Sequence, residues 1–360
     1  MARAFIVGPN ASGKSNLLDA VRFLRDIAVD EGGLQRAVQD RNGFSAIRSL
    51  HARQKADVGI EVHVGDAEEG KTVWQYRLVI RSGKGGAALV REERAIHATR
   101  GEVFSGPAQE DLKDTEALLR TGLEQPRLNR AFREIKKVFE SIEYLHLVPQ
   151  IVRSRTVVNG DFLPFGSSFL EDVLATHAST RRSRLEKIRK AMQPAVPNLE
   201  ALEVRRDSRS GAPHLLGRFG HWRPKAGWQD ESQFSDGTLR LVALLWSAMD
   251  GEGPLLLEEP ELSLHTYLVR RLPSVLWQLT GTRGRQVLMS THSTELLSDE
   301  GIAPGELVLI RPSAEGSVVT SGAEDRDVRG TMEAGLLASE VAPSASARGT
   351  QLGLFGFGKS

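Results

Sequence analysis

The fold is decided by residues 4–26, which read AFIVGPNASGKSNLLDAVRFLRD. Residues 4–7 form a short apolar run, which predicts a buried strand. Residues 15–26 carry apolar side chains at helical spacing, and they predict a helix with one apolar side. The loop between them contains two glycines, Gly8 and Gly13. The expected local structure is therefore strand, glycine-rich loop and helix.

The loop from Gly8 to Ser15 has the GxxxxGKS pattern of a phosphate-binding loop, or P-loop. In such a loop the backbone N–H groups surround phosphate oxygens, the lysine reaches the β and γ oxygens, and the serine hydroxyl binds Mg²⁺. The pattern here follows an apolar strand and opens a helix, whose N-terminus favours anions. We therefore predict ATP contacts from Gly8, Pro9, Asn10, Ala11, Ser12, Gly13, Lys14, Ser15 and Asn16.

A second acidic motif occupies residues 254–261, which read PLLLEEPE. Glu258 and Glu259 follow an apolar strand, at the position where α/β folds bind ligands. Phosphoryl transfer requires mainly orientation and charge neutralisation from the protein. We predict that Glu258 belongs to the Mg²⁺ shell and that Glu259 positions the attacking water. Acidic residues after a strand are more often ordinary loop residues, so this interpretation depends on the P-loop.

Two further segments extend the candidate site. Residues 234–238, FSDGT, open a predicted helix, so Ser235, Asp236 and Gly237 can offer a hydroxyl and backbone amides to a second phosphate. A serine in this position is also a good helix cap, and that alternative remains open. Residues 286–293, QVLMSTHS, form an apolar strand that ends near His292. A histidine at a strand end is usually structural, but beside a nucleotide it can donate a hydrogen bond to a γ-phosphate.

Composition excludes several classes of protein. The chain has 360 residues, a net charge of +1 and no cysteine. Disulfides, thiolate zinc sites, cysteine nucleophiles and zinc-hook repair ATPases are thereby excluded. No apolar run approaches the roughly 20 residues that a membrane helix needs, and no signal peptide is evident. We expect a cytoplasmic protein without a membrane partner.

The pattern along the chain predicts an α/β fold with a mainly parallel core sheet flanked by helices. Strands at 254–257 and 286–290 alternate with helices at 237–249 and 265–279. An antiparallel β meander is predicted at Val58–Val64, Val73–Ile80 and Ala87–Ala98. Helices are predicted at 109–120, 127–142 and 168–192, and a loop-rich stretch at 205–233. We expect one split domain over 1–340, with its core at 1–30 and 230–325, the meander and helical insertion at 41–229, and a disordered tail at 341–360.

Basic residues are unevenly distributed along the insertion. They are Arg181, Arg182, Arg184, Lys187, Arg189 and Lys190, followed by Arg205, Arg206 and Arg209. A solvated helix face is the simpler interpretation. A footprint for DNA phosphates is the alternative.

The four segments GPNASGKSN, FSDGTLR, LLLEEPELSLH and STHS, in this order, resemble the ABC-type ATPase heads of the SMC and RecF class. They are still more similar to the stand-alone predicted ATPases related to the OLD family, and the likeness extends loosely over residues 3–310. The resemblance implies a P-loop NTPase that uses ATP and Mg²⁺. It also implies a head-to-tail dimer with two ATP molecules between the subunits, in which Ser235 and Gly237 act in trans.

On the same resemblance, Lys14 and Ser15 bind phosphate and Mg²⁺, Glu259 is the catalytic carboxylate and His292 is the switch histidine. Residues 261–265 match the loop that joins the two sites across the dimer.

This sequence departs from the pattern of those relatives in three places. Only seven residues precede Gly8, where relatives have a strand pair and an adenine-contacting segment, so we expect a truncated chain or a misplaced start. Thr266 stands where relatives often have proline. The glutamine of the Q-loop is not located, and Gln54 and Gln150 are both candidates.

The leading functional hypothesis is an ATPase whose ATP-driven dimerisation acts as a switch on DNA or on a separate effector such as a nuclease, in repair or anti-phage defence. A built-in nuclease is not expected, because few residues follow His292. One alternative is a module that holds ATP with negligible turnover, and another is an energising subunit of a larger complex. Gln351, Leu352, Leu354 and Phe355 resemble a peptide that docks on the DNA sliding clamp, although an idle tail is the simpler interpretation.

Overall fold

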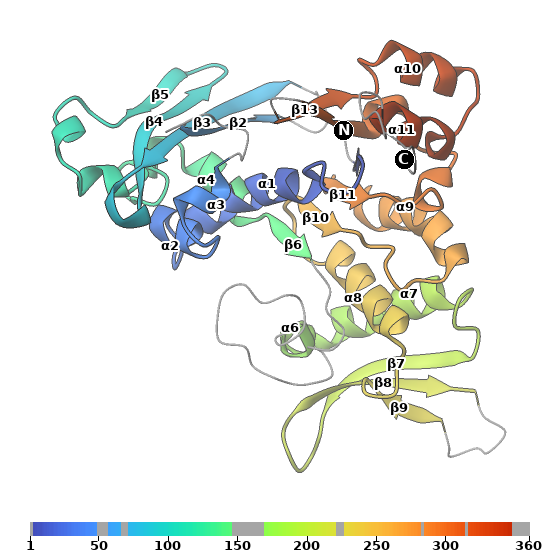
Figure 1. The fold of residues 1–360 in the computed structure, drawn as a ribbon. Coiled ribbons are helices and arrows are strands. Elements are labelled where there is room, and N and C mark those ends of the chain that lie inside the picture. Colours follow the sequence, from blue (N-terminus) through green and yellow to red (C-terminus); the bar gives the residue numbers. More distant parts are fainter. Residues whose placement is uncertain are drawn as a thin grey trace, which may run out of the picture.

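The computed structural model describes residues 3–48, 57–65, 71–145, 169–220, 227–281, 284–313 and 316–347. Its centre is a six-stranded sheet with the strand order β13-β12-β1-β11-β10-β6 (Figure 1). All neighbouring strands are parallel except β12 and β13, which are antiparallel. The strands are β1 (Arg3–Val7), β6 (Glu143–Leu145), β10 (Leu255–Glu258), β11 (Val287–Thr291), β12 (Leu307–Ser313) and β13 (Gly316–Ser321).

Both faces of this sheet are covered, which explains why its central strands are wholly apolar. Every residue of β1 is buried. Phe5 and Val7 pack into one hydrophobic cluster, with α8 (Asp236–Met249), α9 (Thr266–Thr280) and α11 (Ala338–Ala347). Ile6 faces the other way, into a second cluster with α1 (Lys14–Ala28) and α4 (Arg133–Glu140). Successive side chains of one strand thus complete two separate cores.

Two antiparallel sheets flank this core, and Figure 1 shows them at opposite ends of the molecule. The larger contains β2 (Val58–Gly65), β3 (Thr72–Ser82), β4 (Ala88–His97) and β5 (Gly101–Gly106). It packs against α1, α2 (Leu34–Gln39), α3 (Phe44–Ile47) and α4. The smaller contains β7 (Leu199–Arg206), β8 (Pro213–Phe219) and β9 (Trp228–Asp230), beside α6 (Phe169–Ala175) and α7 (Ala178–Met192). The remaining helix is α10 (Arg326–Glu333), and none of the described helices is long and apolar enough to cross a membrane.

The predicted α/β class and the largely parallel core are confirmed, but three helix predictions were wrong in detail. Residues 109–120 contain two short 3-10 turns, Asp111–Lys113 and Ala117–Leu119, because the Asp114 carboxylate accepts the N–H of Glu116 and diverts the chain. Of residues 127–142, only α4 is α-helical. The predicted helix at 168–192 is interrupted between α6 and α7, where the Thr176 hydroxyl bonds to the carbonyl of Asp172.

Three other segments form a different structure from the one predicted. The stretch at 205–233, expected to be loop-rich, contributes most of the β7–β9 sheet. Strand β6, inside the predicted insertion, belongs to the core sheet. Within the predicted disordered tail, residues up to Ala347 form part of α11, with Val341, Ala342 and Ala345 buried. Gln351, Leu352, Leu354 and Phe355 lie outside the described residues.

A buried carboxyl joins the larger antiparallel sheet to the loop that follows it. Glu93 on β4 is 1% exposed and accepts hydrogen bonds from the Tyr76 hydroxyl at 2.8 Å and from the N–H groups of Gly122 at 2.5 Å and Leu123 at 2.9 Å. Burial raises the pKa of Glu93 to about 7, although these bonds favour the charged form. The loop at 121–123 is therefore held by a group that titrates near neutral pH.

The free energy of unfolding should fall as pH rises from about 4.5 to about 7, by up to about 3 kcal/mol from Glu93 alone. In this window the unfolded chain has already lost the proton, whereas the folded chain still keeps it. Denaturant unfolding across the window should show this slope in the native chain and a flatter one in Glu93→Gln. The exposed Glu116→Gln is the matched control, and an unchanged slope in Glu93→Gln would contradict the assignment.

Candidate active site

The P-loop connects β1 to α1 at the carboxyl edge of the sheet. Gly13, immediately before α1, has a φ of 98°, and Ala11 has a φ of 60°. A Cβ atom on Gly8 would lie 2.4 Å from Ser12 Oγ and 2.8 Å from the carbonyl oxygen of Ile310. Only glycine fits this close approach, and a left-handed residue at the helix start favours glycine too. The two glycines of the motif therefore give the loop its shape.

Lys14 lies folded over its own loop. Its Nζ donates to the carbonyl oxygens of Gly8 at 2.8 Å and Pro9 at 2.9 Å, and the side chain is buried. Burial lowers the pKa of Lys14, while the charges of Glu259 and Glu261 raise it. The ammonium group is thus held by two backbone carbonyls and lies within the electrostatic influence of two carboxylates.

Ser15 and Glu258 meet across the site, as predicted for an Mg²⁺ site. Ser15 Oγ donates to Glu258 Oε1 at 2.5 Å, although the two residues are 243 positions apart. Hydroxyl and carboxylate oxygens are the hard ligands that Mg²⁺ accepts, and in nucleotide sites Mg²⁺ takes few protein ligands beside phosphates and water. The described residues contain no cluster of three or more His, Cys, Asp or Glu side chains that could hold a metal. The Ser15 hydroxyl and the Glu258 carboxylate have the donor chemistry that would suit Mg²⁺.

Tyr144 is a site residue that the sequence analysis missed. It lies on β6, opposite Leu256 of β10, and its hydroxyl donates to Glu258 Oε2. Burial, followed by the bond to Glu258, raises the pKa of Tyr144, so the phenol stays protonated and remains a donor. The Arg22 guanidinium lies over the Tyr144 ring, 4.8 Å from its centre. Both oxygens of Glu258 therefore have a hydroxyl partner.

Glu259 and His292, which were predicted as separate site residues, lie beside each other. Nδ1 of His292 lies 3.0 Å from Oε1 of Glu259, and the two side chains are 48% and 29% exposed. Glu259 has a φ of 43°, a left-handed conformation that costs a residue with a side chain on the order of 1–3 kcal/mol. The Glu259 N–H donates to the carbonyl of Ser290 at 3.1 Å, which fixes this turn against β11. The carboxylate of Glu259 thus follows a turn whose backbone is fixed against β11.

Glu261 ties together the segments that follow β10 and β11. Thr291 Oγ1 donates to Glu261 Oε1 at 2.5 Å and accepts the N–H of Ser293 at 3.0 Å. Glu261 is buried, and burial raises its pKa. This bridge holds the chain segments on either side of the Glu259–His292 pair.

Ser235, Asp236 and Gly237 lie at the start of α8, apart from the P-loop contacts described above. Ser235 Oγ caps the helix by accepting the N–H of Thr238 at 3.1 Å, and Ser235 is exposed. A Cβ on Gly237 would lie 2.3 Å from the carbonyl oxygen of Ser263, and its next neighbours belong to Ser263 and Leu264. The structure therefore brings these three residues to the loop at 261–265. Lys14, Ser15, Glu258, Glu259 and His292 form a separate group at the sheet edge.

A P-loop between a buried parallel strand and a helix, facing acidic residues at a nearby strand end, defines a P-loop ATPase fold of the ABC and SMC-head type. The family model described as "AAA domain, putative AbiEii toxin, Type IV TA system" matches residues 3–298, and the chain belongs to this family. No curated protein matches the chain.

Solved SMC head structures are similar to this chain. An SMC head bound to the C-winged helix domain of ScpA is 13% identical, with a TM-score of 0.51 over 91% of this chain and 92% of that chain. The SMC head domain from Thermotoga maritima is 17% identical, with a TM-score of 0.37 over 89% and 90%. An SMC head with an extended coiled coil, bound to the C-terminal domain of ScpA derived from Pyrococcus furiosus, is 11% identical, with a TM-score of 0.43 over 92% and 93%.

Gly237→Ala should lower the free energy of unfolding by about 1–3 kcal/mol, because the new methyl group meets the backbone of Ser263. Gly330→Ala is the matched control: Gly330 lies within α10, is exposed and has open space around it. The control should be neutral or more stable by up to about 1 kcal/mol, since alanine favours the helix. Denaturant unfolding measures both variants, and equal stability would show that α8 and the 261–265 loop are not packed together in solution.

Proposed function

We propose that this protein binds ATP with Mg²⁺ at the P-loop and hydrolyses it, and that ATP holds two copies in a head-to-tail dimer. The observation that carries the proposal is the contact of Ser15 with Glu258 at 2.5 Å, which joins the loop to the acidic strand end. Mg²⁺, when bound there, would neutralise charge on the phosphates and orient them for attack. The group from Gly8 to Asn16 would surround the phosphates.

Lys14 would exchange its partners when ATP binds. Its ammonium group bonds to the carbonyls of Gly8 and Pro9, which are weaker partners than phosphate oxygens. Its partial burial makes that exchange favourable, because a desolvated cation gains more from a nearby anion. Lys14 would then neutralise charge that develops during transfer of the γ-phosphoryl group.

Glu259 would orient the attacking water and accept its proton as the bond to phosphorus forms. His292 supports this role, because its Nδ1 lies 3.0 Å from Oε1 of Glu259 while its side chain remains 48% exposed and could reach a γ-phosphate. The left-handed backbone of Glu259 is the kind of strain that occurs at catalytic positions. Loss of the His292 contact would misplace the carboxylate.

The dimer proposal rests on the position of the α8 start. Ser235 is exposed, and Gly237 contacts the 261–265 loop of its own chain. A nucleotide bound to a second copy could therefore contact Ser235 and the N-terminus of α8. The 261–265 loop, which follows Glu259 closely in the chain, would connect that contact to Glu259. Leu262 and Tyr267, on either side of His265, are 38% and 43% exposed, which leaves apolar surface for that copy.

We further propose that the dimer acts as a switch on DNA or on a separate effector such as a nuclease, in repair or anti-phage defence. The family description, which names a toxin of a Type IV TA system, supports a defence role. One similar SMC head was solved with a domain of another protein, ScpA, which supports a separate partner. Binding of the sliding clamp through Gln351, Leu352, Leu354 and Phe355 stays a prediction, since these four residues lie outside the described residues.

The basic residues of the insertion offer limited support for DNA. Arg184 pairs with Asp250 at 2.6 Å, Arg189 with Glu186 at 2.7 Å and Arg206 with Glu171 at 2.6 Å. Arg182 and Lys187 are exposed on α7. Because much of the positive charge is already paired, we expect weak binding that depends strongly on salt.

Glu259→Gln should reduce steady-state ATP turnover by about 100-fold or more while ATP still binds, because the carboxylate that accepts the proton is removed. Glu300→Gln, an exposed carboxyl outside the site, should retain native turnover. The assay compares equal concentrations with and without duplex DNA, and stimulation by DNA would support the switch on DNA. No turnover in the native chain would favour a module that only holds ATP.

Tyr144→Phe should raise the Mg²⁺ concentration needed for half-maximal turnover by about three- to tenfold, with a smaller change in kcat at saturating Mg²⁺. The change removes the hydroxyl that holds Glu258 Oε2 and leaves the ring under Arg22. Glu300→Gln, the exposed variant outside the site, is the control and should keep the native Mg²⁺ dependence. Native Mg²⁺ dependence in Tyr144→Phe would exclude a positioning role for this phenol.

A further inference from the structure

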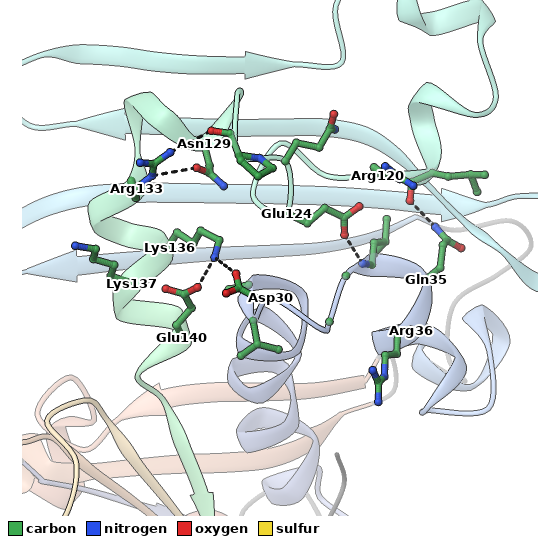
Figure 2. A pocket seen from close by; sticks show the side chains of 18 of the residues that line it. Asp30, Gln35, Arg36, Arg120, Glu124, Asn129, Arg133, Lys136, Lys137 and Glu140 are labelled. Carbon is green, nitrogen blue, oxygen red and sulfur yellow. Dashed lines mark hydrogen bonds and ion pairs between the residues drawn. The ribbon is translucent and has the colours of Figure 1, made fainter. Parts of the chain in front are cut away.

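A cavity of about 910 Å³ lies at the far end of α1, away from the P-loop (Figure 2). The helix has 15 residues, so its last residue, Ala28, lies about 21 Å from Lys14. Figure 2 shows side chains of α4, among them Arg133 and Glu140, on one side, those of Gln35 and Arg36 on the other, and Glu124 between them. The polar lining residues that matter here are Gln35, Glu124, Arg133, Lys136, Lys137 and Glu140.

The walls of this cavity are held by hydrogen bonds within the protein. Gln35 Nε2 donates to the carbonyls of Ala88 and Leu119 at 2.8 Å, and its Oε1 accepts the N–H of Ala88 at 3.2 Å. Glu124 accepts the N–H of Leu34 at 2.7 Å. Gly33, with a φ of 114°, could carry no Cβ without meeting Glu124 at 2.7 Å. These bonds join three separate segments, so the cavity is formed before any ligand enters.

Positive charge exceeds negative charge around the cavity. Two of its carboxylates, Asp30 and Glu140, already pair with Lys136. The third is Glu124, whose pKa is raised by burial, which favours its neutral form. Arg133 and Lys137 are four residues apart on α4 and therefore lie on one face. Within the described ranges, the structure places no carboxylate at ion-pair distance from either of them.

The rest of the lining is partly apolar, from Ala28, Val29, Leu34, Leu119 and Pro126. We propose that this cavity binds a small molecule with a phosphate or carboxylate head, held at Arg133 and Lys137, and an apolar ring-sized body. The volume suits one such ligand, since small-molecule pockets span about 300–1,000 Å³. The guanidinium of Arg133 matches either head group, because both present two oxygens in a plane.

The position of the cavity makes it a regulatory site. Arg41, just after α2, bonds to Asp19 at 2.7 Å and to Asp26 at 2.9 Å, so α2 is fastened to α1 at two points. A ligand that draws α4 toward α2 acts on the helix that begins at Lys14. This regulatory part rests on the proposed ATPase function, whereas binding in the cavity does not.

The test uses the full chain without nucleotide and the fluorescent probe anilinonaphthalene sulfonate, which has an anionic head on apolar rings. We expect saturable binding that Arg133→Gln/Lys137→Gln weakens by about tenfold. Arg127→Gln/Arg130→Gln removes two nearby charges outside the lining and should bind as the native chain does. Lys14→Ala should also bind normally, because it changes only the P-loop.

A second variant keeps the proposal testable if the double variant does not fold. Gln125→Trp places a bulky side chain in the lining of the cavity and should also weaken probe binding. Displacement by phenyl phosphate and by benzoate then identifies the preferred head group. The proposed site would be refuted if a folded cavity variant bound the probe as tightly as the native chain does. It would also be refuted if Lys14→Ala alone lost probe binding.

The regulatory part is measured separately, as ATP turnover at saturating phenyl phosphate or benzoate. We expect at least about a twofold change in the native chain and none in Arg133→Gln/Lys137→Gln, which corresponds to a weak coupling between the two sites. Unchanged turnover in the native chain would refute the regulatory part. Absent turnover would refute the ATPase function and the regulation that rests on it, while the binding result would stand.

Discussion

Burial of β1 between β11 and β12 is the constraint on which the rest of this structure depends. The strand pairs Val7 with Thr291 on one side and with Leu309 on the other. This register satisfies the backbone groups on both edges, which an interior strand requires. It also fixes where the P-loop leaves the sheet, beside the strand ends that present His292 and Glu258. Packing of apolar side chains thereby sets the positions of the polar groups in the site.

The polar groups at this edge depend on that packing in return. Glu258 keeps hydroxyl partners on both oxygens, and Glu261 is buried with a hydroxyl partner from Thr291. Glu259 occupies a conformation that glycine would adopt more easily. A strained backbone conformation persists where the surrounding structure holds it in place. Here the buried strands β10 and β11 hold the turn at Glu259. The backbone of the site is therefore fixed by these strands, while the partly exposed Glu259 and the exposed His292 stay accessible.

Sequence reasoning located the elements whose apolar runs are bounded by clear turns. Strand β10 was predicted from three leucines before Glu258, and the P-loop from its glycines and lysine. Tyr144 could not be found in this way, because its role exists only through the pairing of a three-residue strand with β10. Strand β7 was not predicted, because it ends in two exposed arginines, Arg205 and Arg206. Helix α11 was not predicted, because most of its core contacts come from small alanines. The cavity beside α4 depends on contacts between segments far apart in sequence, which no local pattern contains.

The split core has a consequence for biosynthesis. Strand β1 leaves the ribosome long before its partners β11 and β12, which begin at residues 287 and 307. At about 5–20 residues per second, translation delivers them on the order of tens of seconds later. During that interval the apolar segment of β1 lacks both neighbouring strands, so its backbone N–H and C=O groups can pair with other chains. The N-terminal segment would thus be a natural client for chaperones, and slower translation would lengthen its exposure.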